Sequence, residues 1–124
     1  MTQSDTSGRE QPSLALAPVV HTRTVTVPNA PPIRLQTLDL ARHVAIAPNG
    51  RRYVVATFDD TRLGNGFVTD VYPQQNEYLT LVRIVVCSFS SQNEEDAVQR
   101  HIAVVQGIQQ GRLSELIEQS HQAS

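Results

Sequence analysis

The sequence predicts an α+β fold, in which an antiparallel sheet of about four or five strands packs against one main C-terminal helix. Three observations lead to this prediction: strand-like segments fill the chain up to about residue 89, an Asn-Gly turn joins two of them, and a helical pattern follows. Because the strands precede the helix and do not alternate with helices, the pattern favours an α+β arrangement over a parallel α/β one. A length of 124 residues fits a single domain.

The first 13 residues, MTQSDTSGREQPS, are almost entirely polar. A segment of this composition cannot bury enough apolar surface to offset the entropy cost of becoming ordered. We therefore expect residues 1–13 to form a flexible or partner-bound arm. Residues 14–124 are expected to form the single α+β domain.

The first strand is expected at residues 19–27, where threonine and valine dominate. Pro28, Pro31 and Pro32 follow and end that strand, because proline cannot donate to a strand ladder. Residues 33–40 fit neither a strand nor a helix clearly.

The clearest local signal in the chain is a hairpin. Residues 43–47 and 52–58 are both rich in strand-forming side chains, and Pro48-Asn49-Gly50 lies between them. Asn and Gly tolerate the positive φ angles of a tight hairpin turn. The sequence therefore predicts a β-hairpin with its turn at Asn49 and Gly50.

Two further strands are expected after the hairpin. Residues 59–66, DDTRLGNG, form a loop rich in strand breakers, and residues 67–72 form a strand that Pro73 ends. Residues 78–89 then form a long strand with valine and isoleucine at its centre.

The long strand is apolar on both faces. One face carries Leu79, Leu81, Val85, Cys87 and Phe89, and the other carries Val82, Ile84 and Val86. Because side chains alternate along a strand, one helix can cover only one of these faces. The other face is expected to be covered by residues 14–40, by another copy of the chain, or by a different chain.

The main helix is expected over residues 92–110. Ser91 and Glu94 have the spacing of a capping box, so Ser91 is the expected N-cap. Gly111 is expected to end the helix, and a short second helix is expected from Leu113 onward. The apolar stripe of the main helix contains Ala97, His101, Val104 and Ile108.

The charge pattern excludes several classes of function. The net charge is −2, the ten basic residues are spread along the chain, and all of them are arginine. Nucleic-acid binding needs basic residues gathered on one face, so no nucleic-acid partner is expected. The lack of lysine excludes Schiff-base lysines, the phosphate-binding loop that ends in Lys, and Ser-x-x-Lys nucleophiles.

Cysteine content and hydropathy bear on where the protein resides. Cys87 is the single cysteine and lies in an apolar run, so it is expected in the core. The apolar run at residues 14–20 is short and follows Arg9 and Glu10, unlike a secretory signal. No stretch approaches membrane-spanning length. We therefore expect a soluble protein, cytoplasmic or part of a virion, without membrane insertion.

Two histidines are candidates for a polar site. The four histidines show no metal-ligand spacing with one another or with the cysteine, so neither a metal nor another cofactor is expected. His101 lies on the apolar stripe of the helix and is either a hydrogen-bonded boundary histidine or a catalytic or ligand residue. His43 is expected near the sheet, and no local motif marks its partner.

Asp59 and Asp60 complete the candidate polar site. With Asp70 they bracket a Gly64-Asn65-Gly66 loop, which makes a carboxylate pair for calcium binding or acid-base chemistry conceivable. The spacing does not fit the calcium-loop pattern, and an exposed polar turn is the alternative interpretation.

A candidate interface lies on the long strand. Arg83 interrupts its apolar run, and a buried charge there needs either a carboxylate within the fold or a partner surface. The candidate interface consists of Arg83 and its apolar neighbours Leu79, Leu81, Val82 and Ile84.

One resemblance begins where the long strand ends. The chain there contains, in order, Ser90-Ser91, Glu94-Glu95, Ala97, His101 and Val105. This order resembles short uncharacterised bacterial and phage-encoded proteins, in which a strand ends in Ser or Thr and the next helix carries Glu-Ala and then a histidine. Here Asp96 stands between the glutamates and the alanine. The resemblance covers about half the chain and implies no enzyme activity.

These observations lead to two functional hypotheses. The first is a non-catalytic structural or adaptor subunit of a larger protein assembly, such as a phage particle component, with protein partners or self-association. The alternative is a small enzyme or ligand-binding module that uses His43, His101 or the loop region from Asp59 to Asp70.

Overall fold

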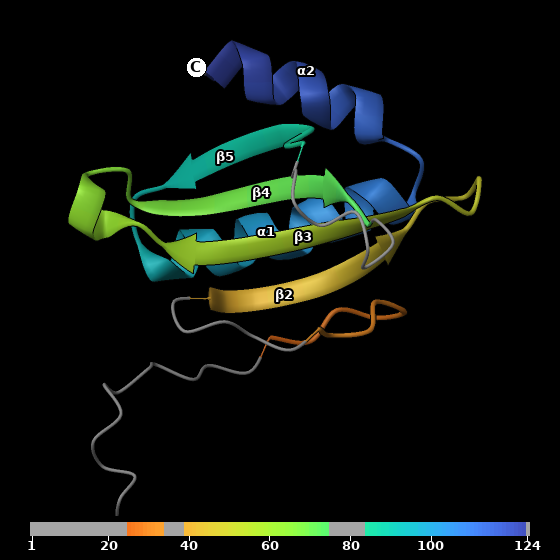
Figure 1. The fold of residues 1–124 in the computed structure, drawn as a ribbon, viewed down its shortest axis with the longest axis horizontal. Helices are drawn as coiled ribbons and strands as arrows, with labels where there is room; N and C mark the ends of the chain where they lie inside the picture. The colour runs from red at the N-terminus through yellow and green to blue at the C-terminus, as the bar shows by residue number, and fades with distance from the viewer. Residues whose placement is uncertain (1–24, 34–38, 75–83, 124) are drawn as a thin grey trace, which may run out of the picture.

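The computed structural model describes residues 25–33, 39–74 and 84–123. Within these residues, four antiparallel strands form one sheet in the order β2-β3-β4-β5, and two helices follow in the chain (Figure 1). The predicted α+β fold is confirmed, because the larger helix, α1, packs on the sheet. The elements are β2 (Asp39–Ile46), β3 (Arg52–Asp59), the 3₁₀ turn η2 (Thr61–Leu63), β4 (Phe67–Pro73), β5 (Cys87–Ser91), α1 (Glu94–Gln109) and α2 (Leu113–Ala123).

The predicted hairpin is confirmed as β2 and β3. Gly50 has a φ of +86°, and its N–H donates to the Ala47 carbonyl at 2.8 Å. The Asn49 side chain accepts from the Arg51 N–H at 3.0 Å and so braces the turn. Only glycine adopts such a φ without strain, which is why the Asn-Gly pair fixes the position of the turn. The strand predicted at residues 67–72 is likewise confirmed as β4.

A bulge in β2 sends neighbouring side chains to different layers. Asp39 lies opposite Phe58 and Ala41 lies opposite Thr57, so Leu40 is the extra residue. Leu40 packs against Ala97 on α1. The bulge therefore turns Asp39 toward the opposite side of the sheet.

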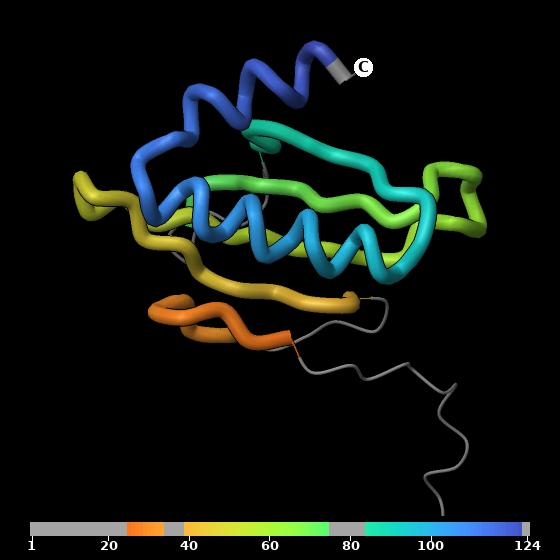
Figure 2. The backbone as a smooth tube through the Cα atoms, turned by 180° about the vertical axis from the view of Figure 1, so that it is seen from behind, coloured from red at the N-terminus to blue at the C-terminus, as the bar shows by residue number. Residues whose placement is uncertain are grey.

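Helix α1 lies against one face of the sheet (Figure 2), and the larger of two apolar clusters in the described part of the chain joins side chains of α1 and of the sheet. Several aliphatic side chains in it are fully buried, and each stabilises the fold by about 2 kcal/mol relative to an exposed position. The fully buried aliphatic members are Val55, Val71, Val104, Val105 and Ile108.

Both edges of the sheet are covered in part. Residues 31–33 lie along β2, where the Val44 N–H donates to the Pro31 carbonyl at 3.0 Å and the Ile33 N–H to the Arg42 carbonyl at 2.9 Å. At the other edge, Ser120 on α2 bonds the backbone of β5. The strand predicted at residues 19–27 is wrong for residues 25–27, which have no strand assignment; residues 19–24 lie outside the described part.

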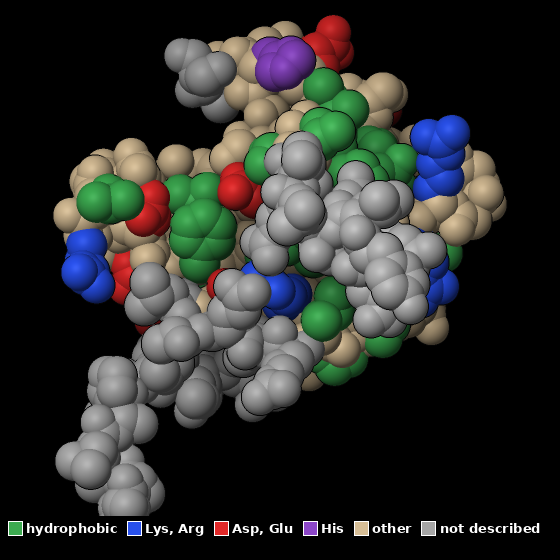
Figure 3. All heavy atoms as spheres, viewed as in Figure 1, with side chains coloured by type: hydrophobic (Ala, Val, Ile, Leu, Met, Phe, Trp, Pro, Cys, Tyr) green, Lys and Arg blue, Asp and Glu red, His purple; other side chains and the backbone are tan. Residues whose placement is uncertain are grey.

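The sheet face turned away from α1 is also partly buried. Val44, Val54 and Ala56 have exposed fractions of 4%, 6% and 3%, and the described part of this face carries both hydrophobic and charged side chains (Figure 3). Of the predicted covering segment, residues 25–33 lie along the edge of β2 (Figures 1 and 2).

The long strand predicted at residues 78–89 needs correction. Residues 78–83 lie outside the described part, residues 84–86 are not in a strand, and β5 begins at Cys87. In β5, buried and exposed side chains alternate, so it is not apolar on both faces. To extend the ladder beyond Cys87, Pro73 of β4 would have to donate a backbone N–H to β5. Proline has no N–H, which explains why β5 begins only at Cys87.

The main helix is confirmed, but its predicted N-cap is wrong. Asn93 is the N-cap, and its Oδ1 accepts from the Asp96 N–H at 2.8 Å. Ser91 cannot cap the helix because it is the last residue of β5. The C-terminal prediction is correct: Gly111 has a φ of +81°, and the Arg112 N–H donates to the Gly107 carbonyl at 2.8 Å. The predicted second helix is α2.

This cap can be tested by substitution. Asn93→Ala is expected to lower the free energy of unfolding by about 1 kcal/mol, because the Asp96 N–H loses its acceptor. Ser91→Ala serves as the comparison and removes no bond at the helix end. Urea denaturation of both variants would contradict the assignment if Ser91→Ala cost more than Asn93→Ala.

Candidate functional site

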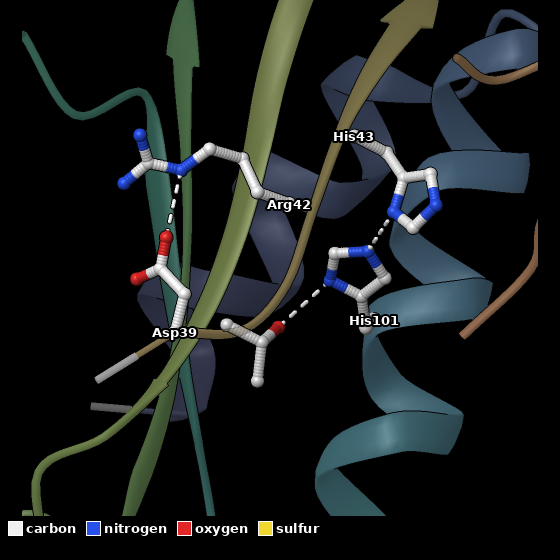
Figure 4. Close-up of polar contacts among 5 residues, drawn as sticks. Asp39, Arg42, His43 and His101 are labelled. Atoms are coloured by element: carbon white, nitrogen blue, oxygen red, sulfur yellow. Dashed lines mark hydrogen bonds and ion pairs between the residues drawn. The ribbon is translucent and has the colours of Figure 1, made fainter. Parts of the chain in front are cut away.

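The two candidate histidines meet in the core. His43 on β2 and His101 on α1 are 58 residues apart in the chain, and their Nδ1 and Nε2 atoms are 2.8 Å apart (Figure 4). Their exposed fractions are 3% and 0%. The ring centroids lie 5.0 Å apart, and the ring planes are tilted by 57°. The alternation of β2 and the apolar stripe of α1 turn both rings toward the same layer.

Two threonines extend this pair into a buried chain of hydrogen bonds. Thr57 Oγ1 lies 2.9 Å from His101 Nδ1 and 2.8 Å from Thr69 Oγ1. Both threonines have an exposed fraction of 0%. The sequence analysis missed them, although each occupies an inward-facing position of a strand opposite the other.

One arrangement of protons satisfies all three contacts at once. Thr69 donates to Thr57, Thr57 donates to His101 Nδ1, and His101 Nε2–H donates to His43 Nδ1. Both imidazoles are neutral in this arrangement, and both nitrogens of His101 have a partner inside the core.

The surroundings of the two rings keep them neutral. Burial and, to a smaller extent, the neighbouring His43 together lower the pKa of His101 to about 3. Burial also lowers the pKa of His43, and an interaction with the Val25 backbone carbonyl opposes this shift in part. The pair therefore joins β2, β3 and α1 as a structural element, and its nitrogens do not face solvent.

The two aspartates of the candidate polar site lie apart from this pair, in the turn between β3 and β4. Asp59 Oδ1 accepts from the Thr61 N–H at 2.9 Å and from its hydroxyl at 2.6 Å, and these bonds lower the pKa of Asp59. Asp60 Oδ2 accepts from Asn65 Nδ2 at 2.7 Å. Their side-chain hydrogen-bond partners among the described residues all belong to the turn, so the two carboxylates brace it.

Cys87 lies in the core at the start of β5, with an exposed fraction of 4%. Burial and, to a smaller extent, the neighbouring Asp70 together raise the pKa of its thiol to about 11. The thiol is therefore protonated and poorly nucleophilic at neutral pH. Asp70 accepts from the Ser88 hydroxyl at 2.6 Å, and burial raises the pKa of this carboxyl.

An ion pair occupies the other side of the sheet. Arg42 Nε lies 2.9 Å from Asp39 Oδ2, and the exposed fractions of the two side chains are 11% and 6% (Figure 4). The Nε–H does not point along a hydrogen-bond direction, so the contact is mainly ionic. A nearly buried pair of this kind fixes neighbouring groups more than it stabilises the fold.

Most of the candidate interface falls outside the described residues. Leu79, Leu81, Val82 and Arg83 are among residues 75–83, which the structure does not describe. Ile84 is described, and its exposed fraction is 60%.

A groove that the sequence analysis did not predict lies between the end of β5 and α1. Its volume is about 430 Å³, which is in the range of ligand pockets. The sequence feature that could have indicated the groove is the polar stripe of Asp96, Gln99 and Arg100, at positions i, i+3 and i+4 of α1. The groove is lined by Ser90, Ser91, Gln92, Asp96, Gln99, Arg100 and Ala103.

No family model, curated protein or solved structure matches the chain. In residues 25–33, 39–74 and 84–123, no helix has the length and apolar character needed to cross a membrane. In the same ranges, no three metal-ligating side chains converge.

Proposed function

We propose that the chain is a non-catalytic subunit of a larger protein assembly, cytoplasmic or part of a virion. The observation that carries this proposal is an exposed aliphatic pair before β5. Ile84 and Val85 have exposed fractions of 60% and 47%, although both are large and aliphatic. Contiguous exposed apolar surface is a feature of protein–protein contact sites, and this pair would form part of such a surface. Burying both would stabilise an interface by about 2 to 4 kcal/mol.

The chemistry of the buried side chains supports the same proposal. His101 uses both ring nitrogens inside the core, His43 is buried against it, and the Cys87 thiol is buried and protonated. The alternative, an enzyme or ligand-binding module based on these histidines or on the loop from Asp59 to Asp70, therefore has less support.

The aliphatic pair gives a direct test. Wild-type protein is expected to associate with itself as its concentration rises in sedimentation velocity, and Ile84→Asp is expected to weaken this association at least tenfold. Leu63→Asp is the matched control, because Leu63 is also aliphatic and has an exposed fraction of 76% but lies in η2. A monomer at every concentration, or equal effects of the two substitutions, would contradict the proposal.

A further inference from the structure

The outer edge of β5 is only partly closed. Ser120 Oγ on α2 accepts from the Ser88 N–H at 3.0 Å and donates to the Ser88 carbonyl at 2.8 Å. Alternate residues of a strand direct their backbone groups to the same edge, so the N–H and carbonyl of Ser90 also point outward. Ser90 is exposed and lines the groove, and no described group bonds its outer side. The backbone N–H and carbonyl of Ser90 are therefore available in the groove, as they would be on an open strand edge.

Arg100 supplies a fixed positive charge beside this edge. Its Cζ atom lies 4.6 Å from the centre of the Phe89 ring, which is itself buried. Stacking of this kind orients the guanidinium plane and leaves its N–H groups free for a planar anion. No described carboxylate lies within ion-pair distance of it, although Asp96 lines the same groove.

The Ser91 hydroxyl is a third free group. Ser91 lines the groove, and its side chain has no hydrogen-bond partner among the described residues. Its hydroxyl can therefore donate to or accept from a segment that enters the groove.

We propose that this groove binds an extended peptide with an acidic side chain, which adds a short strand to the outer edge of β5. The peptide main chain pairs with the N–H and carbonyl of Ser90, as in strand addition to other exposed sheet edges. Its carboxylate accepts from Arg100, and the Ser91 hydroxyl bonds the bound segment. The site lies at the opposite end of β5 from Ile84 and Val85, so the inference goes beyond the proposed assembly role and does not depend on it.

The free backbone pair favours a peptide over a small carboxylate. Acetate or free glutamate could meet Arg100, but neither has a main chain that could pair with Ser90 as a strand does. The groove volume of about 430 Å³ also exceeds what a single carboxylate fills.

Binding can be measured by fluorescence anisotropy with a labelled, end-capped hexapeptide of sequence Val-Thr-Val-Glu-Val-Thr. Arg100→Gln is expected to weaken binding about tenfold or more, because a charge-assisted contact is lost. Arg112→Gln is the matched control, since Arg112 lies beyond α1 and bonds Gln110 outside the groove. A peptide with Gln in place of Glu is expected to bind the wild type as weakly as the Glu peptide binds Arg100→Gln.

Ser90→Pro tests strand addition itself. Proline removes only the outward N–H at this position and is tolerated at a sheet edge, so binding should weaken while the fold persists. Backbone amide NMR spectra check the fold of each variant and should place peptide-induced shifts at residues 90–92 and 96–103. Absence of binding at millimolar peptide, shifts elsewhere, or binding unchanged in Arg100→Gln and Ser90→Pro would overturn the proposal.

Discussion

Acidification from pH 6.5 to about pH 4.5 is expected to destabilise the fold by about 2 to 3 kcal/mol, because His101 must remain neutral in the core. In the unfolded chain, imidazole takes up a proton as the pH falls through 6.5, whereas folded His101 does so only near pH 3. The unfolded state therefore binds more protons in this window. The stabilisation is complete above pH 6.5 and is lost as the pH falls toward 3. His43 acts in the same direction.

Urea denaturation at a series of pH values measures this loss. The window ends near pH 4.5 because carboxylates titrate mainly below this pH and would add their own contribution there. The double variant His43→Leu/His101→Leu should lose this pH dependence. Ring signals of His101 that titrate near pH 6.5 by NMR would show that the histidine is not held neutral.

The elements that the sequence predicts well are those fixed by local geometry. The hairpin turn depends on the φ of Gly50 alone, and the end of α1 depends on the φ of Gly111. The helix itself follows from an apolar repeat within a single segment. Each of these signals lies within one short segment, so it can be read without knowing which other segment packs against it.

The start of β5 and the N-cap of α1 are not local in this sense. Valine and isoleucine at residues 82–86 favour a strand, but the ladder depends on what β4 offers, and β4 ends at Pro73. Because the ladder starts late and runs to Ser91, that residue is no longer free to cap the helix, and Asn93 takes its place. The pairing of β4 with β5 therefore accounts for both errors, in the start of β5 and in the N-cap of α1.

In the candidate polar site, too, the local features were predicted and the contacts between segments were not. The sequence placed His101 on the apolar stripe of a helix and His43 beside the sheet, which is correct for each residue alone. Their contact depends on which face of β2 meets α1, and the pairing of β2 with β3 places His43 opposite Val55 on that face. The groove was missed because it forms only where β5 and α1 come together.

Gly66→Ala is expected to destabilise the fold by about 3 kcal/mol, since two separate costs act at this position. Gly66 has a φ of +72°, where an alanine is strained. A Cβ built there would also lie 2.5 Å from the Ser91 carbonyl oxygen, and this neighbour is backbone and cannot turn away. The clash would push apart β4 and β5 where Phe67 pairs with Ser91.

Gly64→Ala separates these two costs. Gly64 has a similar φ of +80°, in the same loop, but a Cβ there meets no atom within 4 Å. This variant should therefore lose only the strain contribution, about 1 kcal/mol. Urea denaturation of both variants gives the difference, and amide exchange of Phe67 and Ser91 should quicken in Gly66→Ala alone. Equal losses in the two variants would mean that the close approach of Gly66 to β5 contributes nothing to stability.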